Sequence, residues 1–205
     1  MPRSSLISLA LLGAVLLAPN IGAAPIDFAR RALPTPIATS TAKTYLSELT
    51  VAVDSNSPAY ARDLFKTWDI ISGTCDTRET VLKRDGTNVV TDSACKATSG
   101  NWVSPYDGVP TTLASDLDIA WLSGARNWTP AQREAYANDL TRPQLVAITD
   151  NLNESKGDKD IAQWQPPLAS FRCTYARAWV QVKHFYALTI DTAEKSALQS
   201  ILAGC

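Results

Sequence analysis

Four cysteines constrain the fold of this chain more than any other feature: Cys75, Cys95, Cys173 and Cys205. An even number of cysteines in an exported chain favours disulfides over free thiols. Three pairings exist. We favour Cys75 with Cys95 and Cys173 with Cys205, because each pair closes a short loop within one half of the domain. A metal site built from these thiols is the lesser alternative, since no two of them are spaced as CxxC.

The first 23 residues have the pattern of a secretory signal peptide. Arg3 supplies the positive charge, residues 6–17 form an apolar core, and residues 21–23 are the approach to a cleavage site. The apolar core is too short to span a bilayer. Cleavage after Ala23 is preferred to cleavage after Ala24, which would leave Pro25 as the new N-terminus. We therefore expect a secreted, extracellular protein with no membrane contact once the signal is removed.

Residues 24–41 read as a Pro/Thr-rich pro-segment or linker, and residues 42–205 as one domain. The pair Arg30–Arg31 is either a second processing site or part of a solvated linker. Loss of residues 1–31 would remove three of the 19 basic residues and one of the 20 acidic residues, which leaves a net charge of −3. This charge argues against a general polyanion binder. We expect the mature domain to be a monomer.

Capping residues and apolar spacing predict four helices. The clearest start is Thr129, followed by Pro130 and by Gln132 as capping-box partner, with an end expected near Leu140 because of Pro143. The other three helices are expected over 40–53 with Ser40 as N-cap, over 171–186 with a buried aromatic stripe, and from Asp191 to about Leu202. The segment from Cys75 to Trp102 mixes helical, turn and strand signals.

The run from Leu145 to Asp160, LVAITDNLNESKGDKD, changes from a strand-like apolar segment to a dense cluster of carboxylates and amides. Oxygen ligands of this kind suit Mg²⁺ or Ca²⁺. The chain has a single histidine, His184. The commonest proton acceptor at neutral pH is therefore missing from this cluster.

Six separated strings occur in one order: CDTRETVLKRDG from Cys75, GNWVSPYDG from Gly100, SDLDI from Ser115, AWLSGARNW from Ala120, DNLNESKGDKD from Asp150 and CTYARAWVQVK from Cys173. With the final EKSALQSILAGC, they resemble the secreted HNH-type nuclease family related to the C-terminal domain of GmrSD restriction endonucleases. The resemblance covers nearly all of residues 42–205. It implies an α+β fold, a mostly helical single domain with a small two-stranded ββα-metal-like element and two disulfides. In such an element two strands and a helix hold one divalent cation, Mg²⁺ or similar, against a scissile phosphate.

The chain departs from the family pattern at one place. In the family, the strand LDI is followed by an Asp and a His, then by a short apolar turn, and only then by the AWxSGA string. Here Ile119 runs directly into Ala120. The resemblance implies that the missing His is the proton acceptor for the attacking water and that the missing Asp helps to hold the cation. By position, Asp118 matches the first acid of the motif and Asn153 the amide ligand on the helix.

Each candidate residue also has a structural interpretation. Asp118 is either an acid beside a weakened metal site or a solvated residue at the end of a strand. Asn153 is either a cation ligand or, in its NES sequon, a glycosylation site, although we favour a glycan on Asn127 in NWT. Lys156 either binds phosphate or is simply exposed in a polar turn, and His184 is not expected to replace the missing base.

Two arginines in the CDTRETVLKRDG string raise the same question. Arg78 and Arg84 either meet phosphates or form local ion pairs with Asp76, Glu79 and Asp85, and we favour the ion pairs.

Three functions follow from these patterns. The first is a secreted HNH-type nuclease impaired in metal-dependent phosphodiester hydrolysis, which keeps weak affinity for nucleic acid. The second is an active nuclease of which this sequence is a mis-spliced or mis-predicted form, joined at Ile119 and Ala120. The third, from a different class, is a disulfide-stapled secreted protein that binds a partner and no longer acts on nucleic acid.

Overall fold

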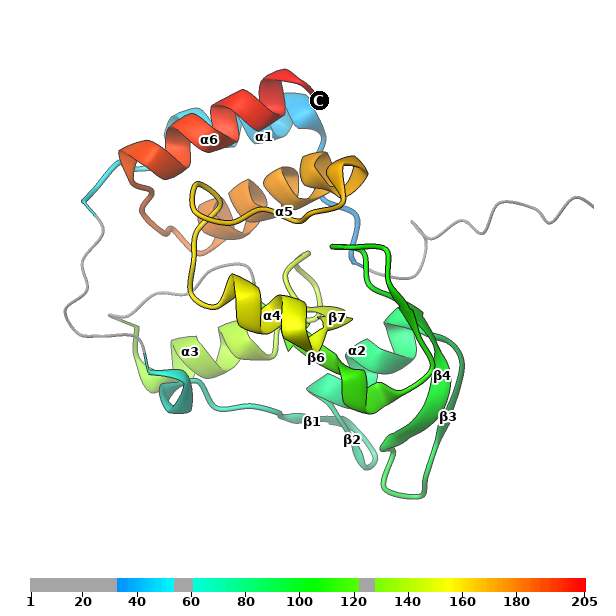
Figure 1. The fold of residues 1–205 in the computed structure, drawn as a ribbon. Coiled ribbons are helices and arrows are strands. Elements are labelled where there is room, and N and C mark those ends of the chain that lie inside the picture. The colour runs from blue at the N-terminus through cyan, green and yellow to red at the C-terminus, as the bar shows by residue number, and fades with distance from the viewer. Residues whose placement is uncertain (1–32, 54–60, 122–127) are drawn as a thin grey trace, which may run out of the picture.

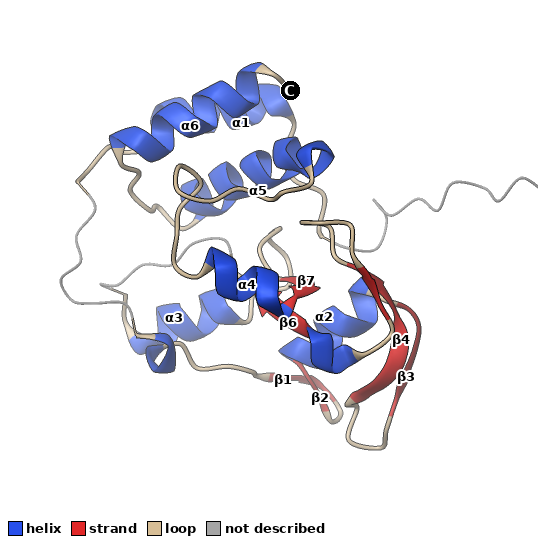
Figure 2. Cartoon of the chain, viewed as in Figure 1, coloured by secondary structure: helices blue, strands red, loops and turns tan. Residues whose placement is uncertain are grey.

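The computed structural model describes residues 33–53, 61–121 and 128–205, and it combines helices with three small antiparallel sheets. The fold is α+β, as expected. At one end of the molecule, three helices lie side by side: α1 (Thr39–Glu48), α5 (Arg172–Phe185) and α6 (Thr192–Ala203) (Figure 1). The strands lie below this helical layer together with α2 (Thr77–Asp85), as the secondary-structure colouring of Figure 2 shows. No helix in the described ranges combines the length and the apolar character that a membrane span requires.

The three sheets each contain only two or three strands. They are formed by β1 (Ile70–Ser72) with β2 (Cys75–Asp76), by β3 (Thr87–Thr91) with β4 (Ala97–Val103) and β5 (Pro110–Thr111), and by β6 (Leu117–Ala120) with β7 (Val146–Thr149). Two further helices, α3 (Pro130–Ala137) and α4 (Asp150–Lys156), flank β7 in the sequence. Short 3-10 turns over Arg62–Leu64, Ala114–Asp116 and Ala169–Phe171 complete the described elements.

Strand β7 is buried at all four of its positions. Successive side chains of a strand point to opposite faces, so β7 needs apolar partners on both sides. On one side, Ala147 joins Val81 and Leu82 of α2 in a small core. On the other side, Val146 and Ile148 join the large core, which contains the aromatic side chains of α5. The β6–β7 pair thus separates the two cores.

The helix predictions hold best where the sequence carries explicit caps. Thr129 and Gln132 form the complete capping box at the start of α3, and the side chain of Asp191 accepts a hydrogen bond from the backbone N–H of Glu194 at the start of α6. In α5 the aromatic stripe is in the core: Tyr175, Trp179 and Val182 are buried, while Phe171 and Tyr186 pack against them.

Three predicted helix boundaries differ from the structure: both ends of α1 and the end of α3. Helix α1 follows Ala38 rather than a Ser40 cap, and it ends at Glu48 instead of continuing to residue 53. It ends early because the backbone of residues 50–52 exchanges hydrogen bonds with Ile190, in a bridge that a continued helix would prevent. Helix α3 ends at Ala137, three residues before Leu140, where the side chain of Asn138 bonds to the carbonyl of Glu134.

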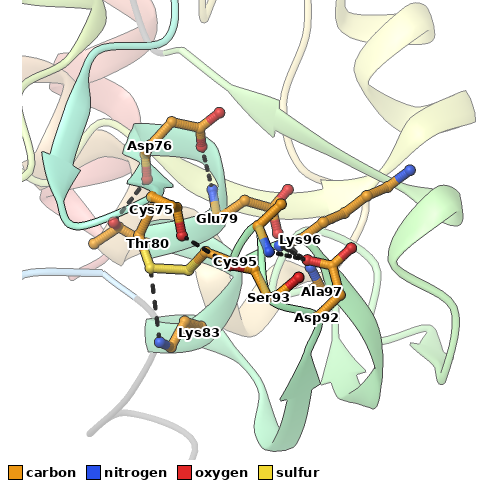
Figure 3. The surroundings of a disulfide bond; sticks show 12 residues. Cys75, Asp76, Glu79, Thr80, Lys83, Asp92, Ser93, Cys95, Lys96 and Ala97 are labelled. Atoms are coloured by element: carbon orange, nitrogen blue, oxygen red, sulfur yellow. Dashed lines mark hydrogen bonds between the residues drawn. A yellow bond between two sulfur atoms is a disulfide. The ribbon is translucent and has the colours of Figure 1, made fainter.

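Both favoured disulfides are present. The Cα–Cα distance is 5.0 Å for Cys75–Cys95 and 5.7 Å for Cys173–Cys205. The first bond joins β2 to the turn between β3 and β4 (Figure 3). Beside it, the carboxylate of Glu79 on α2 accepts a hydrogen bond from the backbone N–H of Ala97, at 2.6 Å. The second bond fixes the C-terminus to the first turn of α5.

Candidate functional site

The candidate site lies where β6, β7 and α4 meet. The two strands pair antiparallel, with Asp118 opposite Ile148 and Leu117 opposite Thr149. Helix α4 begins at Asp150, directly after the last residue of β7, and it packs back across both strands (Figure 1). The polar turn expected after the apolar strand is therefore a helix of two turns. This order of strand, strand and helix presents side chains of α4 to side chains of β6.

Asp118 and Asn153, the two residues singled out by their positions in the motif strings, are in contact. Nδ2 of Asn153 donates a hydrogen bond to Oδ2 of Asp118 at 3.1 Å, and both side chains are half-buried. Asp118 points to the same face of the sheet as its cross-strand partner Ile148, and Leu152 of α4 packs against the core that contains Ile148. Asp118 is therefore not a freely solvated residue at a strand end. The contact joins residues 35 positions apart in the sequence.

This pair offers few ligands to a divalent cation. Mg²⁺ and Ca²⁺ are held by six or more oxygens, of which Mg²⁺ takes one or two from protein carboxylates and the rest from water and phosphate. The pair supplies one carboxylate and one amide oxygen, and the amide N–H₂ is turned toward the carboxylate. Within residues 33–53, 61–121 and 128–205, no three His, Cys, Asp or Glu side chains are grouped as metal ligands. The residues present do not fit a tightly bound cation.

The contact also bears on glycosylation. A glycan on Asn153 would be attached to Nδ2, the atom that bonds to Asp118. The half-buried position of Asn153 on α4 leaves little room for a sugar. The favoured acceptor, Asn127, lies outside the described residues.

Lys156, the last residue of α4, is buried and only 5% exposed. Its Nζ donates to the carbonyl oxygen of Gly157 at 3.3 Å. Burial lowers the pKa of this amine from its usual 10.5 to about 8, and the nearby carboxylate of Asp158 only partly opposes the effect. The alternative of a freely exposed lysine in a polar turn is thus wrong. An ammonium group with one long hydrogen bond in a buried place is costly unless an anion joins it.

Sequence reasoning missed Asp107. Its Oδ2 accepts a hydrogen bond from Oγ1 of Thr149 at 2.9 Å, at the junction of β7 and α4. Asp107 belongs to the GNWVSPYDG string, but no local pattern signals a partner 42 residues further along the chain. The one local signal is the Asp107–Gly108 step, a dipeptide typical of turns.

The two arginines form local interactions, as we favoured. Arg78 pairs with Glu79 at 2.7 Å, and its other nitrogen donates to the carbonyl oxygens of Ala114 and Leu117. Arg84 pairs with Asp85 at 2.7 Å. These guanidinium groups hold secondary-structure elements together.

Asp85 is buried beside the sheet that leads into the site. It accepts a hydrogen bond from the backbone N–H of Ala147 at 2.9 Å, and this bond ties the end of α2 to β7. Burial raises the pKa of its carboxyl group to about 6, although the ion pair with Arg84 opposes the shift.

His184 lies at the contact between α5 and α1 rather than beside β6 and β7. Its ring stacks on Tyr45 with 3.7 Å between the ring centroids. Its Nε2 is 2.7 Å from a carboxylate oxygen of Glu48. These contacts explain the position of the one histidine of the chain. They give it a packing role between α1 and α5, away from the candidate site.

Comparison with known proteins gives one informative relative. No family model matches the chain, and no solved structure matches it. An uncharacterized secreted protein of Arthroderma benhamiae is 55% identical over 174 residues, which are 81% of this chain and 85% of the relative. The chain belongs to the family of that secreted protein. The relationship agrees with the signal peptide expected over residues 1–23, and the protein is secreted into the extracellular space.

Proposed function

We propose that this secreted protein has the scaffold of an HNH-type nuclease and is impaired in phosphodiester hydrolysis. One observation carries the proposal: an antiparallel pair of short strands leads into a helix, and Asp118 on a strand contacts Asn153 on the helix. The motif resemblance assigns these same two positions to the cation site of ββα-metal nucleases. The arrangement supports common ancestry with those enzymes.

Hydrolysis of a phosphodiester needs a group that takes a proton from the attacking water. A positioned general base contributes about 10²–10⁴ in rate. The single histidine, His184, is engaged with Tyr45 and Glu48. The Asp118–Asn153 pair supplies one carboxylate and one amide oxygen, and the carboxylate is already bonded to Nδ2 of Asn153. We therefore infer weak cation binding at this pair and slow cleavage of nucleic acid.

Nucleic-acid affinity in this proposal depends on Lys156, at the end of the helix that carries Asn153. A buried ammonium near α4 is a suitable partner for a phosphate oxygen. The net negative charge of the mature chain keeps such binding weak, since few counterions would be released.

The test compares this chain with a variant in which Asp, His and a short apolar turn are inserted between Ile119 and Ala120. Both are incubated with plasmid DNA and Mg²⁺ or Mn²⁺. We expect the insertion to raise the cleavage rate by about 10²–10⁴. A second insertion variant with Ala in place of the new His is the matched control, and it should cleave as slowly as the chain without insertion. Rapid cleavage by the unaltered chain would contradict the proposal.

A mis-spliced form of an active nuclease is the second candidate, and the direct Ile119–Ala120 junction favours it. Ala120 is fully buried in the strand, so the junction is accommodated without an interruption of β6. Sequencing the transcript across this junction distinguishes the impaired nuclease from the mis-spliced form. A continuous read without codons for Asp and His eliminates the mis-spliced form.

A secreted binding protein without any nucleic-acid contact is the alternative from another class, and the acidic charge favours it. Filter binding to single-stranded and double-stranded DNA at low salt discriminates, because a nuclease-derived site retains polyanions and releases them steeply as salt rises. Lack of retention at low salt would favour the binding protein. Lys156→Met is the informative variant in this assay, and Lys159→Met on the exposed part of the same segment is its control.

A further inference from the structure

The turn between β4 and β5 is fixed by its own hydrogen bonds. The backbone N–H of Ser104 donates to the carbonyl of Val109 at 3.0 Å, and that of Gly108 donates to the carbonyl of Ser104 at 2.8 Å. Gly108 has a φ of 77°, a left-handed conformation that glycine adopts without strain. Asp107 lies between these residues, so its backbone is held in place.

Tyr106 anchors the same turn in the large core. Its side chain is fully buried, and its ring lies 5.5 Å from the ring of Phe171 and 5.3 Å from that of Tyr175, centroid to centroid. Its carbonyl oxygen accepts a hydrogen bond from the backbone N–H of Leu168 at 2.9 Å. The position of Asp107 is therefore defined relative to α5 as well as within the turn.

The two carboxylate oxygens of Asp107 have separate tasks. Oδ1 accepts a hydrogen bond from the backbone N–H of Val109 at 3.2 Å and closes the turn. Oδ2 accepts from the hydroxyl of Thr149 at 2.9 Å. Thr149 is buried and is the last residue of β7, directly before the first residue of α4. Through this hydrogen bond, the turn holds Thr149 at the point where β7 ends and α4 begins.

We propose that Asp107 is a positioning residue of the candidate site: by holding Thr149, it sets the direction in which α4 leaves β7 and so places Asn153 against Asp118. The side chain of Thr149 makes no capping hydrogen bond at the start of α4. Its hydroxyl instead joins the helix start to Asp107. The inference rests on the proposed function only for the meaning of the Asp118–Asn153 contact.

The test reads the side-chain amide of Asn153 by nuclear magnetic resonance in ¹⁵N-labelled protein, with Asn153→Ala used to assign its signals. Asp107→Ala and Thr149→Val each remove one partner of the same hydrogen bond. In both variants we expect the Asn153 side-chain signals to shift, and their exchange with water to become about fivefold faster, as the loss of one hydrogen bond predicts. Two variants that lose opposite partners keep the test valid if one of them does not fold.

Conservative variants separate positioning from charge. In Asp107→Asn, the amide oxygen still accepts from Val109 and the amide nitrogen donates to the hydroxyl of Thr149, so the Asn153 signals should keep their wild-type positions. Thr149→Ser retains the hydroxyl and should do the same. Asp92→Ala is the control for a merely structural effect, because Asp92 also caps a turn through the backbone N–H groups of Ala94 and Lys96, in the distant β3–β4 hairpin.

Unchanged Asn153 signals in both Asp107→Ala and Thr149→Val would overturn the inference. So would an Asp107→Asn variant that behaves like Asp107→Ala, because charge rather than position would then matter. The signals are read without nucleic acid or cation. Shifted Asn153 signals in a protein that binds no DNA would therefore support the role of Asp107 and reject only the proposed function.

Discussion

At the scale of single residues, Lys156 differs most from what its neighbours in the sequence indicate. It lies among Glu154, Ser155, Gly157 and Asp158, a composition typical of a solvated turn. It is nevertheless buried, at the C-terminal end of α4. The protonation of this amine therefore depends on tertiary packing. Its lowered pKa implies a measurable loss in the free energy of unfolding.

The sign of that cost follows from the pKa. The folded state lowers the pKa of Lys156 from 10.5 to about 8, so it disfavours the charged form. The penalty is fully present below pH 8 and disappears as the pH rises above 10.5. We expect Lys156→Met to be more stable than the wild type at pH 7, by on the order of 3 kcal/mol, and the difference to shrink toward pH 10. Urea unfolding at several pH values measures it.

Lys159→Met provides the control, since Lys159 is exposed and its replacement should change stability by less than about 0.5 kcal/mol. A Lys156→Met protein that is less stable than the wild type at pH 7 would show that the ammonium has a partner in solution. Inorganic phosphate should raise the midpoint temperature of the wild type and leave that of Lys156→Met unchanged, since binding to the folded state alone stabilises it.

At the scale of secondary-structure elements, a buried ion pair joins α5 to α6. Nζ of Lys183 lies 2.8 Å from a carboxylate oxygen of Glu194 and donates to the carbonyl oxygen of Thr189 at 2.8 Å. The indole N–H of Trp179 donates to the other oxygen of the same carboxylate. Burial raises the pKa of the Glu194 carboxyl group, and the charge of Lys183 opposes the shift. All the polar atoms in this group have partners.

Removal of one partner leaves the other charge buried and alone. We expect Lys183→Met to lower the free energy of unfolding by about 3–5 kcal/mol. The double variant Lys183→Met with Glu194→Gln should lose less than the sum of the two single variants. A double-mutant cycle from urea unfolding measures this coupling. Strict additivity would contradict a direct interaction between the two side chains.

Elements with local signals could be predicted, and elements held by distant contacts could not. Helix α3 begins where its capping box indicates, and α5 follows its aromatic spacing. Helix α1 stops early because Ile190 pairs with the residues that follow it, a contact that no local pattern contains. At the candidate site, the motif strings identified Asp118 and Asn153. Asp107 escaped because its partner Thr149 is far away in the sequence.

At the scale of the whole molecule, the two disulfides hold opposite ends of the fold. One ties the β3–β4 hairpin to β2, and the other ties the C-terminus to α5. They close loops with sequence separations of 20 and 32 residues. Chain entropy predicts a stabilisation of roughly 3 kcal/mol from each.

We expect Cys75→Ser with Cys95→Ser, and separately Cys173→Ser with Cys205→Ser, to lower the free energy of unfolding by about 3 kcal/mol each. Urea unfolding without reductant measures the loss. A variant with all four cysteines replaced is the control, because added dithiothreitol should leave its stability unchanged. Equal stability of the wild type with and without reductant would contradict the expectation.

The position of β7 between two cores limits how the molecule can be divided. The strand has no face toward water, and it takes apolar neighbours from α2 on one side and from the α5 layer on the other. A fragment that ended on either side of this strand would expose an apolar surface to water. Neither fragment is expected to fold by itself, so truncation near residue 146 should yield insoluble fragments rather than smaller folded domains.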